Sequence, residues 1–298
     1  MTKDELIHFN HNIDTSCKDS IKANQSYKLS DQYAYDILTG KIQSCDLILK
    51  ACEEYIRNRC DPDIKFIDYT RTFFGFLKGT VFPEGSMKRH RQWLTPWMAF
   101  VVTNLYNFHV VDEDTDDLVR LYSQGFIMVG RGNGKTSLSA SLPPFEMCMS
   151  PLGSVKTLSV GNSQESADIL GGYTKALLSS PMVSTFTSAL FQCKSTETVV
   201  GDSKFKPYPA RPDALEGIRL SLAIADEVHT YKDSQMVDVL TDSATGDGWG
   251  SLVLAITTAG DPNNPVAVDM TNRTRNKLHG ITKEERFFGL VYQMDRKD

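Results

Sequence analysis

The sequence predicts an α/β protein built on a mostly parallel β-sheet, with a helical segment in front of it. Apolar runs of strand length alternate with helical stretches between about residues 86 and 285, which is typical of a parallel sheet. One run leads into a glycine-rich turn, and another ends in two adjacent acids. Together these observations favour a ligand site at the carboxyl edge of the predicted sheet.

The segment that precedes the sheet is expected to be mainly helical. Its apolar side chains recur at helical spacing, at Ile37, Leu38, Ile42, Leu47, Ile48, Ala51 and Tyr55. Residues 79–85, in which Pro83 lies between two glycines, form a natural break. We therefore expect a helical subdomain over residues 1–85, a core over 86–285, and the start of a linker over 286–298.

A glycine-rich turn follows the apolar run 126–129. It has the sequence Gly-Arg-Gly-Asn-Gly-Lys-Thr-Ser over residues 130–137, and a helical stretch begins at Leu138. A strand, a glycine-rich turn ending in Gly-Lys-Thr and a helix form the phosphate loop that cradles a nucleoside triphosphate. Val129 stands where the usual motif has its first glycine. The alternative interpretation is chance turn chemistry after a strand.

The residue types in this turn suit ATP and Mg²⁺. Gly132 and Gly134 lack Cβ atoms, so backbone N–H groups can converge on phosphate oxygens. Lys135 would reach the β- and γ-phosphates, the Thr136 hydroxyl would ligate Mg²⁺, and the helix N-terminus adds positive charge. The predicted nucleotide-binding set is Gly130, Gly132, Asn133, Gly134, Lys135, Thr136 and Ser137.

Arg131 lies inside the turn, four residues before Lys135. Its flat, permanently charged guanidinium suits the charge that develops on a transferring phosphoryl group. We expect it to contact the γ-phosphate once the loop closes on nucleotide. The alternative is a surface arginine on a mobile loop.

Two elements are expected between this turn and the acids. Residues 156–161 form the strand after the phosphate-loop helix, and another helix begins near residue 162 with Ser163 as its cap. Residues 196–202 indicate a hairpin rather than part of the parallel sheet.

Residues 220–227 indicate a buried strand that ends in Asp226 and Glu227. Asp226 is placed to hold the Mg²⁺ shell, and Glu227 suits orienting or deprotonating the attacking water. The acids follow the phosphate loop by about ninety residues, which is the order and spacing of an additional-strand, RecA-like P-loop NTPase core. The alternative is a strand followed by a solvated acidic turn.

Another strand run, residues 251–260, ends in Thr257 and Thr258. Hydroxyls beside an acid-bearing strand can sense the γ-phosphate and pass its loss to a neighbouring segment. An ordinary strand end with β-favouring threonines explains them equally well. His229, in an Asp-Glu-x-His pattern, either couples nucleotide to nucleic acid or is a polar residue on a loop after the strand.

Together these motifs resemble the large terminase subunit of tailed bacteriophages. The resemblance covers about residues 30–290 and is carried by residues 35–42, 93–100, 131–136, 215–229 and 256–260. The segment 93–100 is similar to the family's signature near the adenine site. Trp93 and Trp97 lie four residues apart, so they form either a stripe of the core or, for Trp97, a contact with the base. Met98 stands where the family commonly has glutamine, which removes an amide able to read the adenine edge.

The resemblance implies an ATP-driven motor that moves double-stranded DNA into a preformed capsid. Copies of the chain would form a homo-oligomeric ring in the host cytoplasm, monomeric in isolation, and would work with a portal protein and a small terminase subunit. A neighbouring copy would complete each site, with Arg211 or Arg219 as the trans-acting arginine finger. Family members also carry a C-terminal nuclease. Only thirty-eight residues follow Gly260, so we expect this chain to be the ATPase part.

Composition favours an intracellular protein. No run approaches the roughly eighteen apolar residues that span a bilayer, and the N-terminus lacks a signal-peptide pattern. The six cysteines show no Cys-x-x-Cys pair and are expected to be reduced. The net charge of −5 weighs weakly against a broad nucleic-acid surface, although the basic clusters at 88–91 and 272–277 are either solvated faces or DNA contacts.

Two other functions compete with this interpretation. A superfamily 2 helicase or translocase is disfavoured, because no second RecA-like domain fits after Gly260 and no Gln-x-x-Gly-Arg-x-x-Arg segment occurs. A nucleotide-binding switch without useful turnover would not need the second acid of the Asp226-Glu227 pair.

Overall fold

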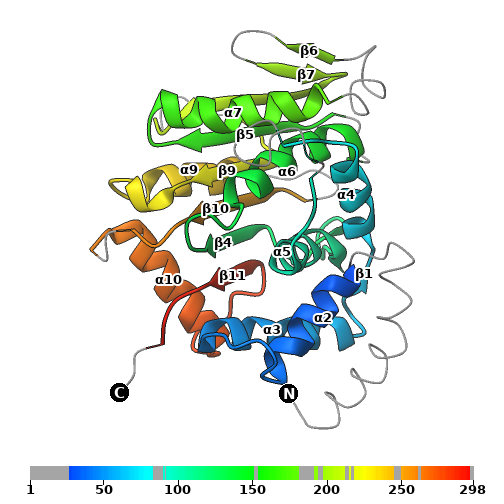
Figure 1. Ribbon diagram of the computed structural model, residues 1–298, viewed down its shortest axis with the longest axis vertical. Helices are drawn as coiled ribbons and strands as arrows, with labels where there is room; N and C mark the ends of the chain where they lie inside the picture. Colours follow the sequence, from blue (N-terminus) through cyan, green and yellow to red (C-terminus); the bar gives the residue numbers. More distant parts are fainter. Residues whose placement is uncertain are drawn as a thin grey trace.

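The computed structural model describes residues 27–82, 90, 92–150, 154–180, 191–193, 197–211, 215, 218–244, 250–260 and 263–295. Within these residues the chain forms one large sheet, a small second sheet and flanking helices (Figure 1). The α/β class predicted from the sequence is confirmed. No helix in the described ranges is long and apolar enough to cross a membrane.

The large sheet has eight strands within the described residues. In spatial order they are β11 (Phe287–Val291), β4 (Gln124–Met128), β10 (Leu252–Thr257), β9 (Leu222–Asp226), β5 (Lys156–Gly161), β8 (Ser203–Pro209), β7 (Thr198–Val200) and β6 (Phe191–Cys193). The strands from β11 to β8 pair in parallel, whereas β8, β7 and β6 pair antiparallel. The expected hairpin therefore lies at the sheet edge, and its second strand, β8, joins the parallel part.

The strand order places β10 between β4 and β9. Thr257 of β10 lies beside Met128 of β4, and Ile256 lies beside Asp226 of β9. Because parallel strands end at the same edge of a sheet, the turn after β4 and the acids after β9 come together there. The predicted additional-strand arrangement is confirmed.

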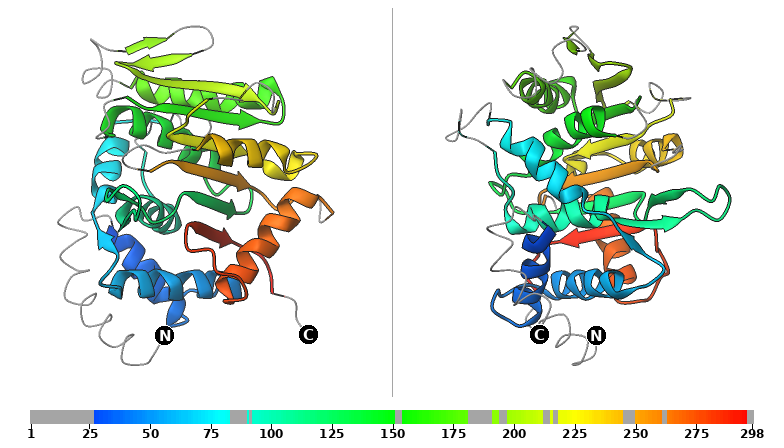
Figure 2. Two further views of the ribbon diagram at one scale, coloured as in Figure 1. Left: turned by 180° about the vertical axis from the view of Figure 1, so that it is seen from behind. Right: turned by 90° about the vertical axis from the view of Figure 1, so that its right-hand side faces the viewer.

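Helices cover both faces of this sheet. The chain moves one way along the sheet through α6 (Lys135–Met149) and α7 (Gln164–Leu178), and the other way through α9 (Gln235–Ser243) and α10 (Pro265–Leu278). Right-handed crossovers therefore put these two pairs of helices on opposite faces (Figure 2). Such covering explains why every residue of β10 is buried. Ser163 caps α7 as predicted, by accepting a hydrogen bond from the backbone N–H of Ser166.

The first part of the described chain packs directly onto this core. It comprises α2 (Tyr27–Leu38), α3 (Asp46–Cys60), α4 (Tyr69–Lys78), α5 (Pro96–Asn107) and the small sheet β1 (Lys65–Phe66), β2 (Phe108–Val111) and β3 (Leu118–Arg120). The rings of Tyr33 and Tyr55 each lie 5.1 Å from the ring of Phe100 on α5. α2 and α5 thus share one core, although residue 85 was expected to divide them. Cys45, Cys52, Cys60 and Cys148 are free thiols.

The sheet also extends past residue 285, where we expected the core to end. β11 pairs with β4 along its whole length, from Phe287 opposite Gln124 to Val291 opposite Met128. All five residues of β11 are buried. An apolar strand of this kind completes the sheet, so residues 287–291 belong to the core and not to a linker.

Two cations of the basic cluster 272–277 form ion pairs with acids, and one of them, Lys277, is buried. Lys277 of α10 forms an ion pair with Glu54 of α3 and lies 5.0 Å from the ring centre of Tyr122. Arg273 pairs with Glu284 and lies 4.1 Å from the ring centre of Phe287. The Lys277 side chain is only 7% exposed and so is not part of a solvated face, whereas the Arg273 side chain is 36% exposed and either interpretation stays open for it. Most of the cluster 88–91 lies outside the described residues.

Candidate functional site

The glycine-rich turn runs from the end of β4 into the first turn of α6. Gly132 and Gly134 have φ angles of +79° and +80°, which glycine adopts without steric cost. Gly134 is also crowded, because a Cβ there would lie 2.3 Å from the Cε of Met98 on α5. The first N–H groups of α6 have no partner within the helix, so this terminus suits an anion. The loop therefore has the backbone that phosphate contact requires.

Side chains of the turn divide between holding the loop and facing outward. The Asn133 side-chain amide donates to the carbonyl of Gly130 at 3.0 Å. Ser137 donates to the buried side chain of Gln92 at 3.2 Å. Arg131 is exposed. Sequence reasoning missed Gln92, whose only signal is its place directly before the 93–100 motif.

The two acids follow β9 with different backbone geometry. Asp226 is the last residue of the strand, and Glu227 has a φ of +52° as it caps the short 3₁₀ helix η2 (Val228–Thr230). Such a left-handed conformation is uncommon and costly for a residue with a side chain. The backbone N–H of Glu227 donates to Asp226 Oδ1 at 3.1 Å. In a continued strand, the side chains of Asp226 and Glu227 would point to opposite faces of the sheet. The turn at Glu227 instead keeps both carboxylates near the phosphate loop.

Lys135 meets both acids. Its ammonium group forms an ion pair with Glu227 Oε1 and lies 3.9 Å from Asp226 Oδ1. The lysine is only 7% exposed although it begins a helix at the sheet edge. One buried cation therefore faces two carboxylates.

Burial and this charge pattern shift the two carboxyl groups in opposite directions. Burial raises the pKa of Asp226 to about 6, with Glu227 adding to the rise and Lys135 opposing it. Burial also acts to raise the pKa of Glu227, but the hydrogen bond and charge of Lys135, together with His229, outweigh it and lower that pKa. Glu227 is therefore the more readily ionised acid, and a cation near Asp226 would favour its charged form.

The second oxygen of Glu227 connects the acid to the end of β10. Glu227 Oε2 lies 3.1 Å from His229 Nδ1 and 3.4 Å from both the N–H and the hydroxyl of Thr258. Thr257 Oγ1 lies 2.8 Å from the same His229 nitrogen. The structure thus places Thr258 beside the acid and Thr257 beside His229. Their sensing role stays a prediction.

The other predicted residues, Trp97, Arg211 and Arg219, lie in segments outside this cluster. Trp97 is half-buried at the start of α5, with its ring 6.4 Å from that of Tyr292, and its neighbour Met98 packs against Gly134 of the loop. Arg211 is exposed just after β8, at the carboxyl edge. Arg219 is also exposed, but it precedes β9 and so lies toward the opposite edge.

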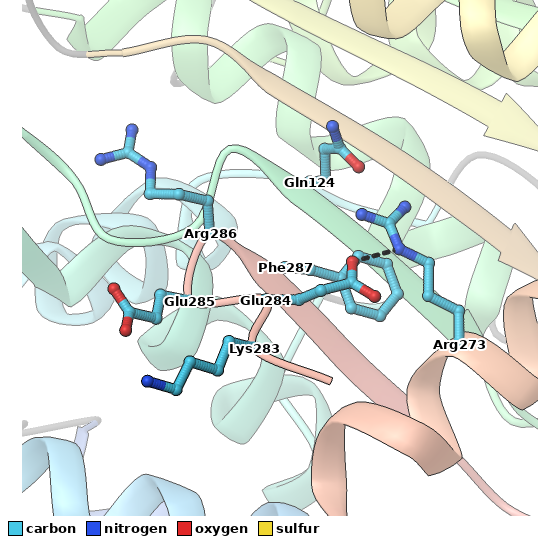
Figure 3. Close-up of a pocket in the computed structure, with 7 residues that line it drawn as sticks. All are labelled: Gln124, Arg273, Lys283, Glu284, Glu285, Arg286 and Phe287. Atoms are coloured by element: carbon cyan, nitrogen blue, oxygen red, sulfur yellow. Dashed lines mark hydrogen bonds and ion pairs between the residues drawn. The ribbon is translucent and has the colours of Figure 1, made fainter. Parts of the chain in front are cut away.

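A separate cavity of about 330 Å³ lies at the amino edge of the sheet (Figure 3). Gln124 and Phe287, which line it, begin β4 and β11, whereas the phosphate loop follows the other end of β4. Figure 3 shows Arg273 and Glu284 joined across it, with Arg286 directed away. Its position separates this cavity from the predicted nucleotide site.

Comparisons with known proteins agree with this geometry. Residues 96–275 match the family described as "Terminase large subunit, ATPase domain". The structure is similar to the large terminase of bacteriophage HK97, with a TM-score of 0.58 and 16% identity over 77% of this chain and 45% of that one. This likeness shows a shared fold, and the chain spans about 45% of the length of that protein.

Weaker similarity extends to two further solved structures. The large terminase ATPase domain of Thermus phage P74-26 has a TM-score of 0.44 and 19% identity over 61% of this chain and 77% of that one. The large terminase of a thermophilic bacteriophage, solved in complex with ADP, has a TM-score of 0.40 and 15% identity over 57% of this chain and 40% of that one. No curated protein sequence matches this chain.

Proposed function

Because the chain belongs to the terminase large subunit family through its ATPase domain, we propose that it hydrolyses ATP to drive double-stranded DNA into a viral procapsid. The observation that carries the proposal is the cluster in which Lys135 faces Asp226 and Glu227 at the carboxyl edge of the sheet. A strand bearing two acids, next to a strand that reaches the phosphate loop, is the arrangement that phosphoryl transfer needs.

The residues present fit ATP together with Mg²⁺. Mg²⁺ commonly takes one or two protein ligands and completes its shell with phosphates and water. Thr136 and Asp226 would supply a hydroxyl and a carboxylate. No cluster of three or more His, Cys, Asp or Glu side chains that could hold a metal occurs in the described ranges, so a cation shared with phosphates fits better than one held by protein alone. When bound, the ion would neutralise charge on the phosphates.

During the reaction, Lys135 would leave Glu227 for the phosphates of the nucleotide, and Glu227 would turn to the attacking water. The phosphates attract the ammonium group of Lys135, so nucleotide binding would separate it from Glu227 Oε1. That oxygen is then free to orient the attacking water or accept its proton, while His229 and Thr258 stay beside the other oxygen of Glu227. The ion pair seen here is therefore an arrangement that we expect before nucleotide binds.

Other residues would complete the site. Arg131 is exposed on the loop, where it can turn toward the γ-phosphate, and Trp97 would abut the base. Thr257 and Thr258 would respond to the γ-phosphate through Glu227. Either Arg211 or Arg219 would act in trans, which predicts that a variant lacking the finger regains turnover when mixed with Glu227→Gln subunits in an oligomer. Double-stranded DNA, a portal protein, a small terminase subunit and a homo-oligomeric ring are the partners that this function requires.

The test is ATP turnover by the wild type and by Glu227→Gln. The variant keeps the shape of the side chain and removes its charge, so we expect ATP to bind and hydrolysis to fall by about 10²-fold or more. Nucleotide affinity is measured alongside by fluorescence titration. Hydrolysis by Glu227→Gln at the wild-type rate would contradict the assignment. Tight ATP binding without turnover by the wild type would instead favour a nucleotide-binding switch.

A further inference from the structure

His229 joins the acid to the segment that follows β10. It lies on η2, and its side chain is 15% exposed. Its ring nitrogen Nδ1 lies 3.1 Å from Glu227 Oε2 and 2.8 Å from Thr257 Oγ1. Its backbone N–H also donates to Thr257 Oγ1 at 3.2 Å. His229 therefore contacts Glu227 through its side chain, and Thr257 through both its side chain and its backbone.

The hydrogen-bond partners of the His229 ring determine which of its nitrogens carries the proton. Thr257 donates its hydroxyl proton to the carbonyl of Thr258 at 3.1 Å, so its oxygen offers only lone pairs to His229. The ionised carboxylate of Glu227 also only accepts. Nδ1 must therefore carry the proton and share it between the two oxygens. In this tautomer His229 donates a hydrogen bond to the acid.

This bond is expected to persist when the other contact of Glu227 is lost. Lys135 holds Oε1 in the present arrangement, and phosphates would compete for that lysine. They would not compete for the Nδ1–H of His229. Thr258 is the other group on Oε2, at 3.4 Å, so the shorter contact to His229 fixes the carboxylate once Lys135 has left.

The ring is also packed against the backbone of Gly260. A Cβ placed on Gly260 would lie 2.3, 2.6 and 2.8 Å from Cδ2, Cγ and Cβ of His229. A displacement of the segment 257–260 toward the ring would therefore push the ring, and through it the carboxylate of Glu227. A polar residue that merely filled a loop would need neither this close approach nor the two hydrogen bonds.

We propose that His229 is a positioning residue that holds Glu227 toward the attacking water and links its orientation to the segment 257–260. This inference rests on the proposed hydrolysis of ATP. It predicts that loss of the ring lowers kcat with little change in nucleotide affinity, because nothing that touches nucleotide is removed. Removing a partner that orients a reacting group typically costs roughly 10- to 100-fold.

Three substitutions separate positioning from a structural role. In His229→Asn the amide nitrogen occupies the place of Nδ1, so most of kcat should return. In His229→Gln the amide lies one bond further out, and in His229→Ala it is absent, so both should be about tenfold slower or worse. Lys232→Ala, an exposed change on the same loop, is the matched control and should behave as wild type. The backbone bond from residue 229 to Thr257 remains in all of them.

Gly260→Ala tests the link to the strand end. Its methyl group should push the ring away and lower kcat while leaving affinity unchanged. In a His229→Ala background the further loss should be smaller, because the two ring carbons are gone and only the 2.8 Å contact with Cβ remains. Strict additivity of the two changes would contradict a link through the ring.

The outcomes distinguish this inference from the proposed function. Turnover by the wild type together with an undiminished kcat in His229→Ala would overturn the positioning role alone. Equal losses in the Asn, Gln and Ala variants, with parallel losses of thermal stability, would also overturn it. If the wild type, tested with Mg²⁺ in its assembled form, hydrolyses no ATP, the proposed function and this inference both fail.

Discussion

Charged side chains gather at both edges of the large sheet, but they are matched differently. At the amino edge and along α10, Arg273 pairs with Glu284, Lys277 pairs with Glu54, and each cation also lies over an aromatic ring. At the carboxyl edge, Lys135 faces two acids at once. One-to-one pairing leaves little charge for a ligand to satisfy. An unequal cluster in which one carboxyl group, that of Asp226, has a raised pKa is typical of a functional site.

The largest stability effect is expected at the amino edge and along α10, where Arg273 and Lys277 are each paired with one acid. Lys277→Met removes one partner of a pair whose side chains are only 7% and 15% exposed, and so leaves Glu54 uncompensated. We expect a loss of about 2–4 kcal/mol in the free energy of unfolding, slightly less than for a fully buried pair. Denaturant unfolding measures it, and turnover per folded molecule should not change.

A matched double variant sharpens that result. Lys277→Met combined with Glu54→Gln leaves no buried charge, so it should be more stable than Lys277→Met alone. If the double variant is as unstable as the sum of the single changes, the pair contributes no coupling. The contrast between the two edges would then lose its basis.

A smaller stability effect of opposite sign is expected at the carboxyl edge, where Lys135 faces two acids. The pKa of Asp226 is raised to about 6, so the folded protein binds a proton more tightly than the unfolded chain does, and this group destabilises the fold as pH rises from about 4 to 6. Asp226→Asn removes that cost. Without nucleotide it should gain about 1–3 kcal/mol above pH 6 and little below pH 4.

Thermal unfolding across this pH range checks the change, with Asp242→Asn as a control at an exposed helical position outside the cluster. The gain should accompany loss of ATP hydrolysis, because the substitution removes the carboxylate that we propose as a Mg²⁺ ligand. An Asp226→Asn protein that is less stable than wild type at pH 7 would contradict the expected destabilisation by the buried carboxylate.

The smallest effect on stability is expected for a substitution of Arg131, which is exposed on the loop. Arg131→Ala should lower turnover by about tenfold or more while changing ATP affinity and thermal stability little, because its partner is the developing charge on the γ-phosphate. Steady-state rates and nucleotide titration separate the two quantities. Equal, unchanged values for both would identify a surface arginine without a role in the reaction.

How far the sequence predicted the site depends on the separation of the residues involved. The phosphate loop, the acid-bearing strand and the strand ending in Thr257 are continuous segments with periodic or motif signals, so their type and order were predictable. Contacts between distant segments carry no such signal. The pair Lys277–Glu54 joins residues of two helices, so the burial of Lys277 within the basic cluster was not predictable.

The same limit applies within the site. Asp226 and Glu227 were predicted from their place after a strand, but the positive φ of Glu227 follows from packing and not from a glycine in the sequence. The contact of the His229 ring with Gly260 depends on how two loops meet. The core was expected to end at residue 285 because composition alone does not show that β11 pairs with β4.

The left-handed backbone of Glu227 has a consequence for sequence design. Glycine would adopt a φ of +52° without cost, whereas a glutamate there costs about 1–2 kcal/mol. A procedure that optimised stability alone would replace Glu227 by glycine or asparagine and Asp226 by a neutral residue. It would thereby erase the two side chains that the carboxyl edge is built to present. A redesign of this fold for higher thermostability should therefore hold both positions fixed.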